Sequence, residues 1–99
     1  MTAEITKNGS VLIIKVEGRI DTVTSPELEA KIRENVPGVD DMTIDIHGVE
    51  YISSAGLRVL LSAQKIMDKQ GKLLIRGVSE NLMEIFEVTG FVDILNIEE

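Results

Sequence analysis

Cysteine and tryptophan are absent from this 99-residue sequence, and histidine occurs once, as His47. Without cysteine the chain cannot form a disulfide, a thiolate nucleophile or a cysteine metal site. One histidine cannot build a histidine-rich metal site, so we expect neither a metal nor a cofactor. Aromatic residues are limited to Tyr51, Phe86 and Phe91, too few for a platform on which nucleic-acid bases stack. These absences favour a binding or regulatory module over an enzyme.

Basic residues are also scarce, since 10 Lys and Arg stand against 17 Asp and Glu and give a net charge of −7. This charge argues against nucleic-acid backbones and anionic membrane surfaces as partners, and it allows basic ones. No apolar run approaches the roughly 20 residues of a membrane span, so we expect no membrane insertion. The first residues show no signal-peptide pattern, and the cytoplasm is therefore the expected compartment.

The length predicts one domain over residues 1–99, and the residue pattern predicts an α/β fold. Two short strands flank Asn8-Gly9, a pair typical of a type I′ hairpin turn. The predicted strands are Ala3–Lys7, Val11–Glu17, Met42–Ile46 and Lys72–Arg76. The predicted helices run from Pro26 to about Asn35, from Ser54 to Gln70 with Gly71 as its stop, and from a Ser79 cap to Thr89. The order β-β-α-β-α-β-α, with a short tail, predicts a mixed, mostly parallel sheet of four or five strands with helices packed on it.

The segment Tyr51–Leu57 leads from a predicted loop into the second helix. Ser54 is a natural N-cap there, and the small residues Ala55 and Gly56 leave the helix start open. Because a helix N-terminus favours phosphate, the fold would tolerate phosphorylation of Ser54. Local chemistry alone favours a plain helix cap over a phosphorylation site.

The chain resembles the STAS domain, the fold of bacterial anti-sigma factor antagonists, over nearly its whole length. The resemblance is carried by Gly18-Arg-Ile-Asp21, by the stretch from Ile44 to Leu57 that ends in Ser-Ser-Ala-Gly-Leu, and by Gly71–Gly77 with Phe86–Gly90. It implies the STAS fold and a regulatory function.

In this family the phosphoacceptor serine usually lies in an Asp-Ser-Ser/Thr-Gly-Leu pattern. Alignment on Gly56-Leu57 implies that Ser54 is the acceptor, with Ser53 in place of the usual aspartate and as the alternative acceptor. Ala55 replaces the second hydroxyl residue. The resemblance also implies that Asp21 lies near the acceptor and assists phosphoryl transfer or docking, although a simple turn aspartate explains it equally well.

The second predicted helix has a wider apolar surface than a single stripe. One face carries Leu57, Leu60, Leu61, Gln64 and Met67, and another carries Val59, Ala63 and Ile66. Either neighbouring elements cover both faces, or part of the surface docks a partner beside Arg58. The residues expected to dock a partner are Asp21, Thr22, Ser53, Ala55, Gly56, Leu57, Arg58 and Leu61.

The resemblance implies an anti-sigma factor antagonist, a bacterial phosphoprotein that regulates transcription by partner switching. Its unphosphorylated form would bind a GHKL-type anti-sigma factor serine kinase and free a sigma factor. The kinase would phosphorylate Ser54 to end the interaction, and a PPM-type serine phosphatase would remove the phosphate. The chain itself would have no catalytic residue.

Two alternatives come from other functional classes. One is a STAS adaptor subunit of a lipid-transport ABC complex, which would not be phosphorylated. The other is a small hydrolase in which His47 activates Ser54, and it requires the two side chains within hydrogen-bonding distance.

Overall fold

The chain begins with an antiparallel hairpin of β1 (Thr2–Asn8) and β2 (Val11–Ile20) in the computed structural model, which describes residues 1–98. Asn8 pairs with Val11, so the central turn residues are Gly9 and Ser10. Gly9 has a φ of 63°, and no non-glycine residue in the described part has a positive φ. The hairpin is therefore as predicted, but a positive φ at the first central residue alone fits type II′ and not type I′.

Five strands form one sheet in the order β1-β2-β3-β4-β5, and every pair except β1–β2 is parallel. The remaining elements are α1 (Ser25–Asn35), β3 (Asp41–Ile52), α2 (Ser54–Asp68), β4 (Lys72–Arg76), α3 (Glu80–Thr89), the 3-10 turn η1 (Phe91–Asp93) and β5 (Ile97–Glu98). The predicted element order and mixed sheet are confirmed, and the tail supplies a helical turn as well as the fifth strand.

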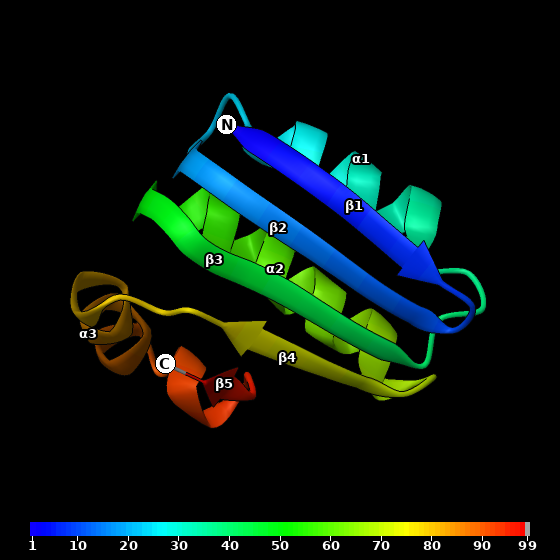
Figure 1. Cartoon of the computed structure of the whole chain (residues 1–99). Coiled ribbons are helices and arrows are strands. Elements are labelled where there is room, and N and C mark those ends of the chain that lie inside the picture. The colour runs from blue at the N-terminus through cyan, green and yellow to red at the C-terminus, as the bar shows by residue number, and fades with distance from the viewer. Residues whose placement is uncertain (99) are drawn as a thin grey trace.

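The core lies between the sheet and the helices α1 and α2, which cover the same face of it (Figure 1). Strand residues alternate between this covered face and an open face, as the period of two requires. Met42, Ile44 and Ile46 of β3 are fully buried, as predicted, and the helices contribute Leu28 and Leu60. Helix α3 lies apart from α1 and α2, near the end of β4.

Strands β2 and β3 are longer than the sequence predicted, because each continues through a glycine. Gly18 has a φ of 94° and lies at an irregularity in the pairing of β2 with β3. Opposite Glu17 lies Gly48, where a Cβ would come within 2.7 Å of the Glu17 Cγ. Both strands continue through these glycines, whereas the predicted strands ended before them, at Glu17 and Ile46.

The helix ends follow the predictions at α1 and α3 but not at the end of α2. Ser79 caps α3 by accepting from the Leu82 N–H, and Gly90 ends it with a φ of 79°. Helix α2 ends at Asp68, and Gly71 has no positive φ. A Cβ at Gly71 would lie 1.9 Å from the Asp40 carbonyl oxygen, so the glycine permits a close chain approach. No helix in residues 1–98 is long and apolar enough to cross a membrane.

Candidate functional site

The ends of β2 and β3 bring two distant segments together. Ile20 pairs with Ile52, and the Ser53 N–H donates to the Ile20 carbonyl oxygen at 2.8 Å. Because both strands run in the same direction, the loop between β2 and α1 meets the first turn of α2. This junction contains Asp21, Ser53 and Ser54.

Ser53, and not Ser54, is the N-cap of α2. Its backbone is extended, and its hydroxyl oxygen accepts from the Gly56 N–H at 3.3 Å. The predicted cap at Ser54 is wrong by one residue, because Ser54 already lies in the first helical position. The neighbouring serines therefore differ in role: one hydroxyl is used by the helix and the other is not needed there.

Ser54 is exposed at the N-terminus of α2, whose first turn contains no acidic residue. The positive end of a helix stabilises a negative group placed beside it. Arg58 lies four residues later, and side chains at this spacing are neighbours on a helix surface. The position can therefore accept a phosphate without displacing a side chain from the core.

Gly56 brings the start of α2 close to the sheet. A Cβ at this position would lie 2.7 Å from both Ile20 Cγ2 and Ile52 Cγ1. The expectation that Gly56 leaves the helix end open is wrong, because Gly56 is buried against the two strand ends. Its small size fixes the position of Ser53 and Ser54 over the β2–α1 loop.

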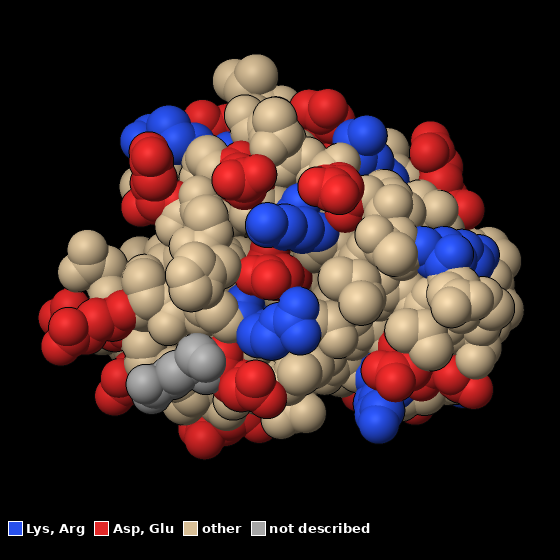
Figure 2. Space-filling view, viewed as in Figure 1, with Lys and Arg blue, Asp and Glu red and all other residues tan. Residues whose placement is uncertain are grey.

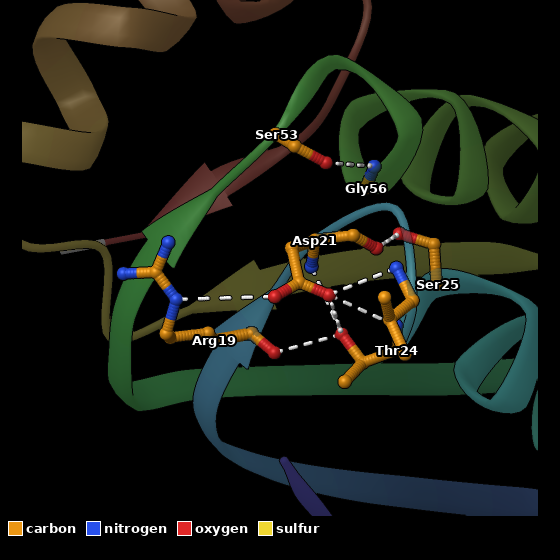
Figure 3. A network of polar contacts seen from close by, with 7 residues as sticks. Arg19, Asp21, Thr24, Ser25, Ser53 and Gly56 are labelled. Atoms are coloured by element: carbon orange, nitrogen blue, oxygen red, sulfur yellow. Dashed lines mark hydrogen bonds and ion pairs between the residues drawn. The ribbon is translucent and has the colours of Figure 1, made fainter.

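Asp21 orders the β2–α1 loop through its carboxylate, as Figure 3 shows. Asp21 Oδ1 accepts from the N–H groups of Val23 and Thr24, each at 3.0 Å. In return, the Asp21 N–H donates to the Thr24 hydroxyl at 2.9 Å, and the Asp21 carbonyl accepts from the Ser25 hydroxyl. Asp21 is thus a turn aspartate, while Oδ2 has only a distant ion pair with Arg19 Nε at 3.8 Å.

These donors lower the pKa of Asp21 below its ordinary value. The largest cause is the Thr24 N–H, which outweighs the opposing effect of burial, and the Thr24 hydroxyl, the Val23 N–H and Arg19 add to it. Hydrogen bonds to the ionised form stabilise it. A fixed negative charge therefore lies beside the serine pair at neutral pH.

The other residues of the predicted docking set differ in exposure. Thr22 and Arg58 are exposed, Ala55 and Leu61 are half-buried, and Leu57 is buried together with Gly56. Most of the apolar surface of α2 is also covered, since Val59, Leu60, Ala63 and Met67 are buried. Neighbouring elements therefore cover most of the wide apolar surface of α2. Leu57 belongs to the buried core beneath the site and not to its exposed surface.

Two features of this surface were missed from the sequence. Val23 lies at the tip of the β2–α1 loop with 85% of its surface exposed, and its only sequence signal is an apolar residue between two threonines. The Arg19 guanidinium lies 4.3 Å from the centre of the Tyr51 ring. That cation–π contact joins β2 to β3, and the sequence separation of the two residues hides it.

His47 is too far from Ser54 to activate it. His47 is an exposed residue within β3, and five residues of strand, about 16 Å, separate it from Ile52 at the end of the strand. The His47 backbone N–H donates to Asp45 Oδ1 at 2.9 Å. This geometry excludes the hydrolase alternative that pairs His47 with Ser54.

Metal ligands do not gather at this junction. Within residues 1–98, no group of three or more histidine, aspartate or glutamate side chains is arranged to hold a metal ion. The junction offers an exposed hydroxyl at a helix N-terminus and, on the adjoining β2–α1 loop, a carboxylate and an exposed apolar side chain.

Comparison with known proteins places this geometry in a wider context. The family model described as the STAS domain matches residues 2–99. The anti-sigma-B factor antagonist of Staphylococcus aureus strain NCTC 8325 is 31% identical over 101 residues, covering 100% of this chain and 94% of the relative.

Solved structures show the same fold. A crystal structure of an anti-sigma factor antagonist from Mycobacterium paratuberculosis superposes with a TM-score of 0.89 at 24% identity, covering 98% of this chain and 84% of that one. The Bacillus cell fate determinant SpoIIAA in its phosphorylated form gives a TM-score of 0.72 at 16% identity, covering 97% of this chain and 90% of that one.

Proposed function

The chain belongs to the STAS domain family, and from this membership we propose that it acts as an anti-sigma factor antagonist. In the proposed cycle the unphosphorylated chain binds an anti-sigma factor, a serine kinase of the GHKL type, and so frees a sigma factor. Phosphorylation of Ser54 by that kinase ends the interaction. A PPM-type phosphatase removes the phosphate and restores binding.

The observation that carries the proposal is the different use of the two serines. Ser53 accepts from the Gly56 N–H and is half-buried, whereas Ser54 is exposed and has no role in the cap. A kinase needs access to a hydroxyl, and a regulatory switch needs a fold that survives the modification. Ser54 is accessible and its modification leaves the helix cap in place, whereas Ser53 is half-buried and is needed for the cap.

Electrostatics supports the effect of the phosphate on binding. A phosphoserine adds a charge of about −1.5 to −2 at neutral pH. This charge would add to that of the Asp21 carboxylate on the adjoining β2–α1 loop, on a surface that must lose water when a partner docks. An interface fitted to a neutral hydroxyl therefore has to desolvate a dianion, which weakens the complex.

The proposed docking surface consists of the exposed and half-buried residues around Ser54. They are Asp21, Thr22, Val23, Ser53, Ser54, Ala55, Arg58 and Leu61. Val23 supplies an apolar anchor, and ordered Asp21 supplies a fixed carboxylate for a basic side chain of the kinase. Arg58 is placed to neutralise part of the phosphate charge after transfer, which keeps the first turn of α2 intact.

Site mapping with matched variants tests the acceptor. The chain is incubated with the kinase and ATP, and phosphopeptides are identified by mass spectrometry for the wild type, Ser54→Ala and Ser53→Ala. We expect phosphate on the wild type and on Ser53→Ala, and none on Ser54→Ala. Phosphate retained by Ser54→Ala, or lost only in Ser53→Ala, contradicts the assignment.

A further inference from the structure

The negative charge of the molecule is concentrated at one end of the chain. No lysine or arginine follows Arg76, while six acidic residues do, so residues 77–99 carry −6 of the net charge of −7. These acids are Glu80, Glu84, Glu87, Asp93, Glu98 and Glu99. The remainder of the chain is almost neutral.

The open face of the sheet carries charges of both signs, in contrast to α3. Strand pairing places Glu4, Lys15, Asp45, Arg76 and Glu98 in one row across the five strands, with the sign of the charge alternating. Figure 2 shows red and blue side by side over this face, but red without blue over α3 at the lower left. Acidic side chains on α3 therefore lack the basic neighbours that the sheet provides.

Helix α3 also presents two hollows to solvent that share Glu84. One has a volume of about 600 Å³ and is lined by Val78, Glu80, Met83, Glu84 and Glu87. The other, of about 210 Å³, is mainly apolar and is lined by Asn81, Glu84, Ile85, Val88 and Thr89. Val88 is 84% exposed, so this end of the fold combines an apolar hollow with an acidic border.

From this combination we propose that the exposed side of α3, defined by Glu80, Glu84, Ile85, Glu87 and Val88, is a second docking surface for a basic amphipathic helix of a partner protein. A large apolar side chain of that helix fills the hollow at Ile85 and Val88. Lysine or arginine side chains one turn apart then face Glu80, Glu84 and Glu87, which have the same spacing. Complementary charge sets the register and accelerates association.

This surface is separate from the junction at Ser54. It lies on a different helix, and α3 stands apart from α2 in Figure 1. Binding at α3 therefore does not require the Ser54 site. This proposal does not rest on the proposed function, and either proposal can fail without the other.

Binding of a designed probe tests the surface. The probe is a fluorescein-labelled helical peptide of about 18 residues with a leucine stripe flanked by lysines at i, i+3 and i+7. A second peptide carries glutamate at the lysine positions. We expect saturable binding of the first, measured by fluorescence polarisation, and none of the second. Backbone amide shifts in NMR spectra should concentrate on residues 80–88 and spare residues 53–58.

Variants distinguish this surface from general attraction to an acidic protein. Glu84→Lys should lower the affinity for the lysine peptide about tenfold, because it reverses the charge of the one side chain that lines both hollows. Glu34→Lys, the same charge change at an exposed position of α1, should leave the affinity within about twofold. Val88→Thr, which keeps the shape but replaces one methyl group by a hydroxyl, should weaken binding about three- to fourfold.

The proposal is overturned by equal losses in Glu84→Lys and Glu34→Lys, by amide shifts scattered over the acidic surface, or by absence of saturable binding. Self-association of the wild-type chain that Val88→Thr abolishes would assign the surface to a second copy and would also overturn it. None of these outcomes depends on phosphorylation of Ser54.

Discussion

Replacement of Ser53 and Ser54 by alanine, one at a time, separates the helix cap from the proposed phosphoacceptor. Ser53→Ala removes the acceptor of the Gly56 N–H, a bond of 3.3 Å. Loss of a serine N-cap costs about 1 kcal/mol, within a range of roughly 0.5 to 2. Because the bond lies just beyond the usual length, we expect a loss of about 0.5–1 kcal/mol in the free energy of unfolding. Ser54→Ala should change it by less than about 0.5 kcal/mol, since the side chain is exposed.

The chain offers an internal calibration for this measurement. Ser79 caps α3 through the same geometry, accepting from the Leu82 N–H at 3.3 Å. Ser79→Ala should therefore cost about as much as Ser53→Ala, whereas Ser53→Asp should retain stability because aspartate is an equally good cap.

Urea unfolding followed by far-UV circular dichroism measures these differences, and thermal unfolding supports them. A loss of 0.5–1 kcal/mol lowers the melting temperature by about 2–8 °C in a domain of this size. A loss in Ser54→Ala equal to that in Ser53→Ala, or a neutral Ser53→Ala beside a destabilising Ser79→Ala, would refute the cap assignment.

Two further predictions concern other parts of the fold. Gly71→Ala should cost at least about 2 kcal/mol of unfolding free energy in the same urea assay, because its Cβ would lie 1.9 Å from the Asp40 carbonyl oxygen and the backbone must move; a neutral effect would show that the close approach is absent. Asp45→Asn should make thermal stability less dependent on pH below about pH 4. Burial opposes ionisation of Asp45, but the His47 N–H and Arg76 outweigh burial and lower the pKa of Asp45 in the folded state. The stabilisation of the wild type is therefore present above the ordinary pKa of 3.8 and is lost as the pH falls through the lower pKa of the folded state. Melting temperatures measured from about pH 7 to about pH 2 check this, and parallel curves for the two proteins would contradict it.

The elements with strong local signals were predictable from the sequence. Alternation identified the buried face of β3 at Met42, Ile44 and Ile46. Ser79 and Gly90 marked both ends of α3 correctly, because a cap serine and a left-handed glycine act within a few residues of the helix. Local chemistry decides these features, and one sequence is enough to find them.

Features that depend on distant neighbours were not predictable in the same way. Gly48 faces Glu17 of another strand, which the sequence did not indicate, and Gly71 faces Asp40 instead of acting as the predicted helix stop. The two hydroxyls at the start of α2 are chemically alike, and only the position of the helix start assigns the cap to Ser53. The segment around Ser53 and Ser54 stays a predicted site, and the structure corrects only the position of its helix cap.

The proposed switch needs few reactive groups. Asp21 orders the loop, Gly56 lets the helix start lie close to the sheet, and Ser53 completes the cap. Ser54 is then left as an exposed hydroxyl, where a phosphate would change charge and hydration without unfolding the helix.

The affinity of the chain for the proposed anti-sigma factor kinase, measured before and after complete phosphorylation by that kinase and ATP, tests the central claim most directly. Isothermal titration calorimetry on the wild type and on Ser54→Ala provides both values. The account predicts that phosphorylation weakens the wild-type complex by about tenfold or more, while Ser54→Ala binds as tightly as the unmodified wild type after the same treatment. Equal affinity of the phosphorylated and unphosphorylated wild type would contradict it.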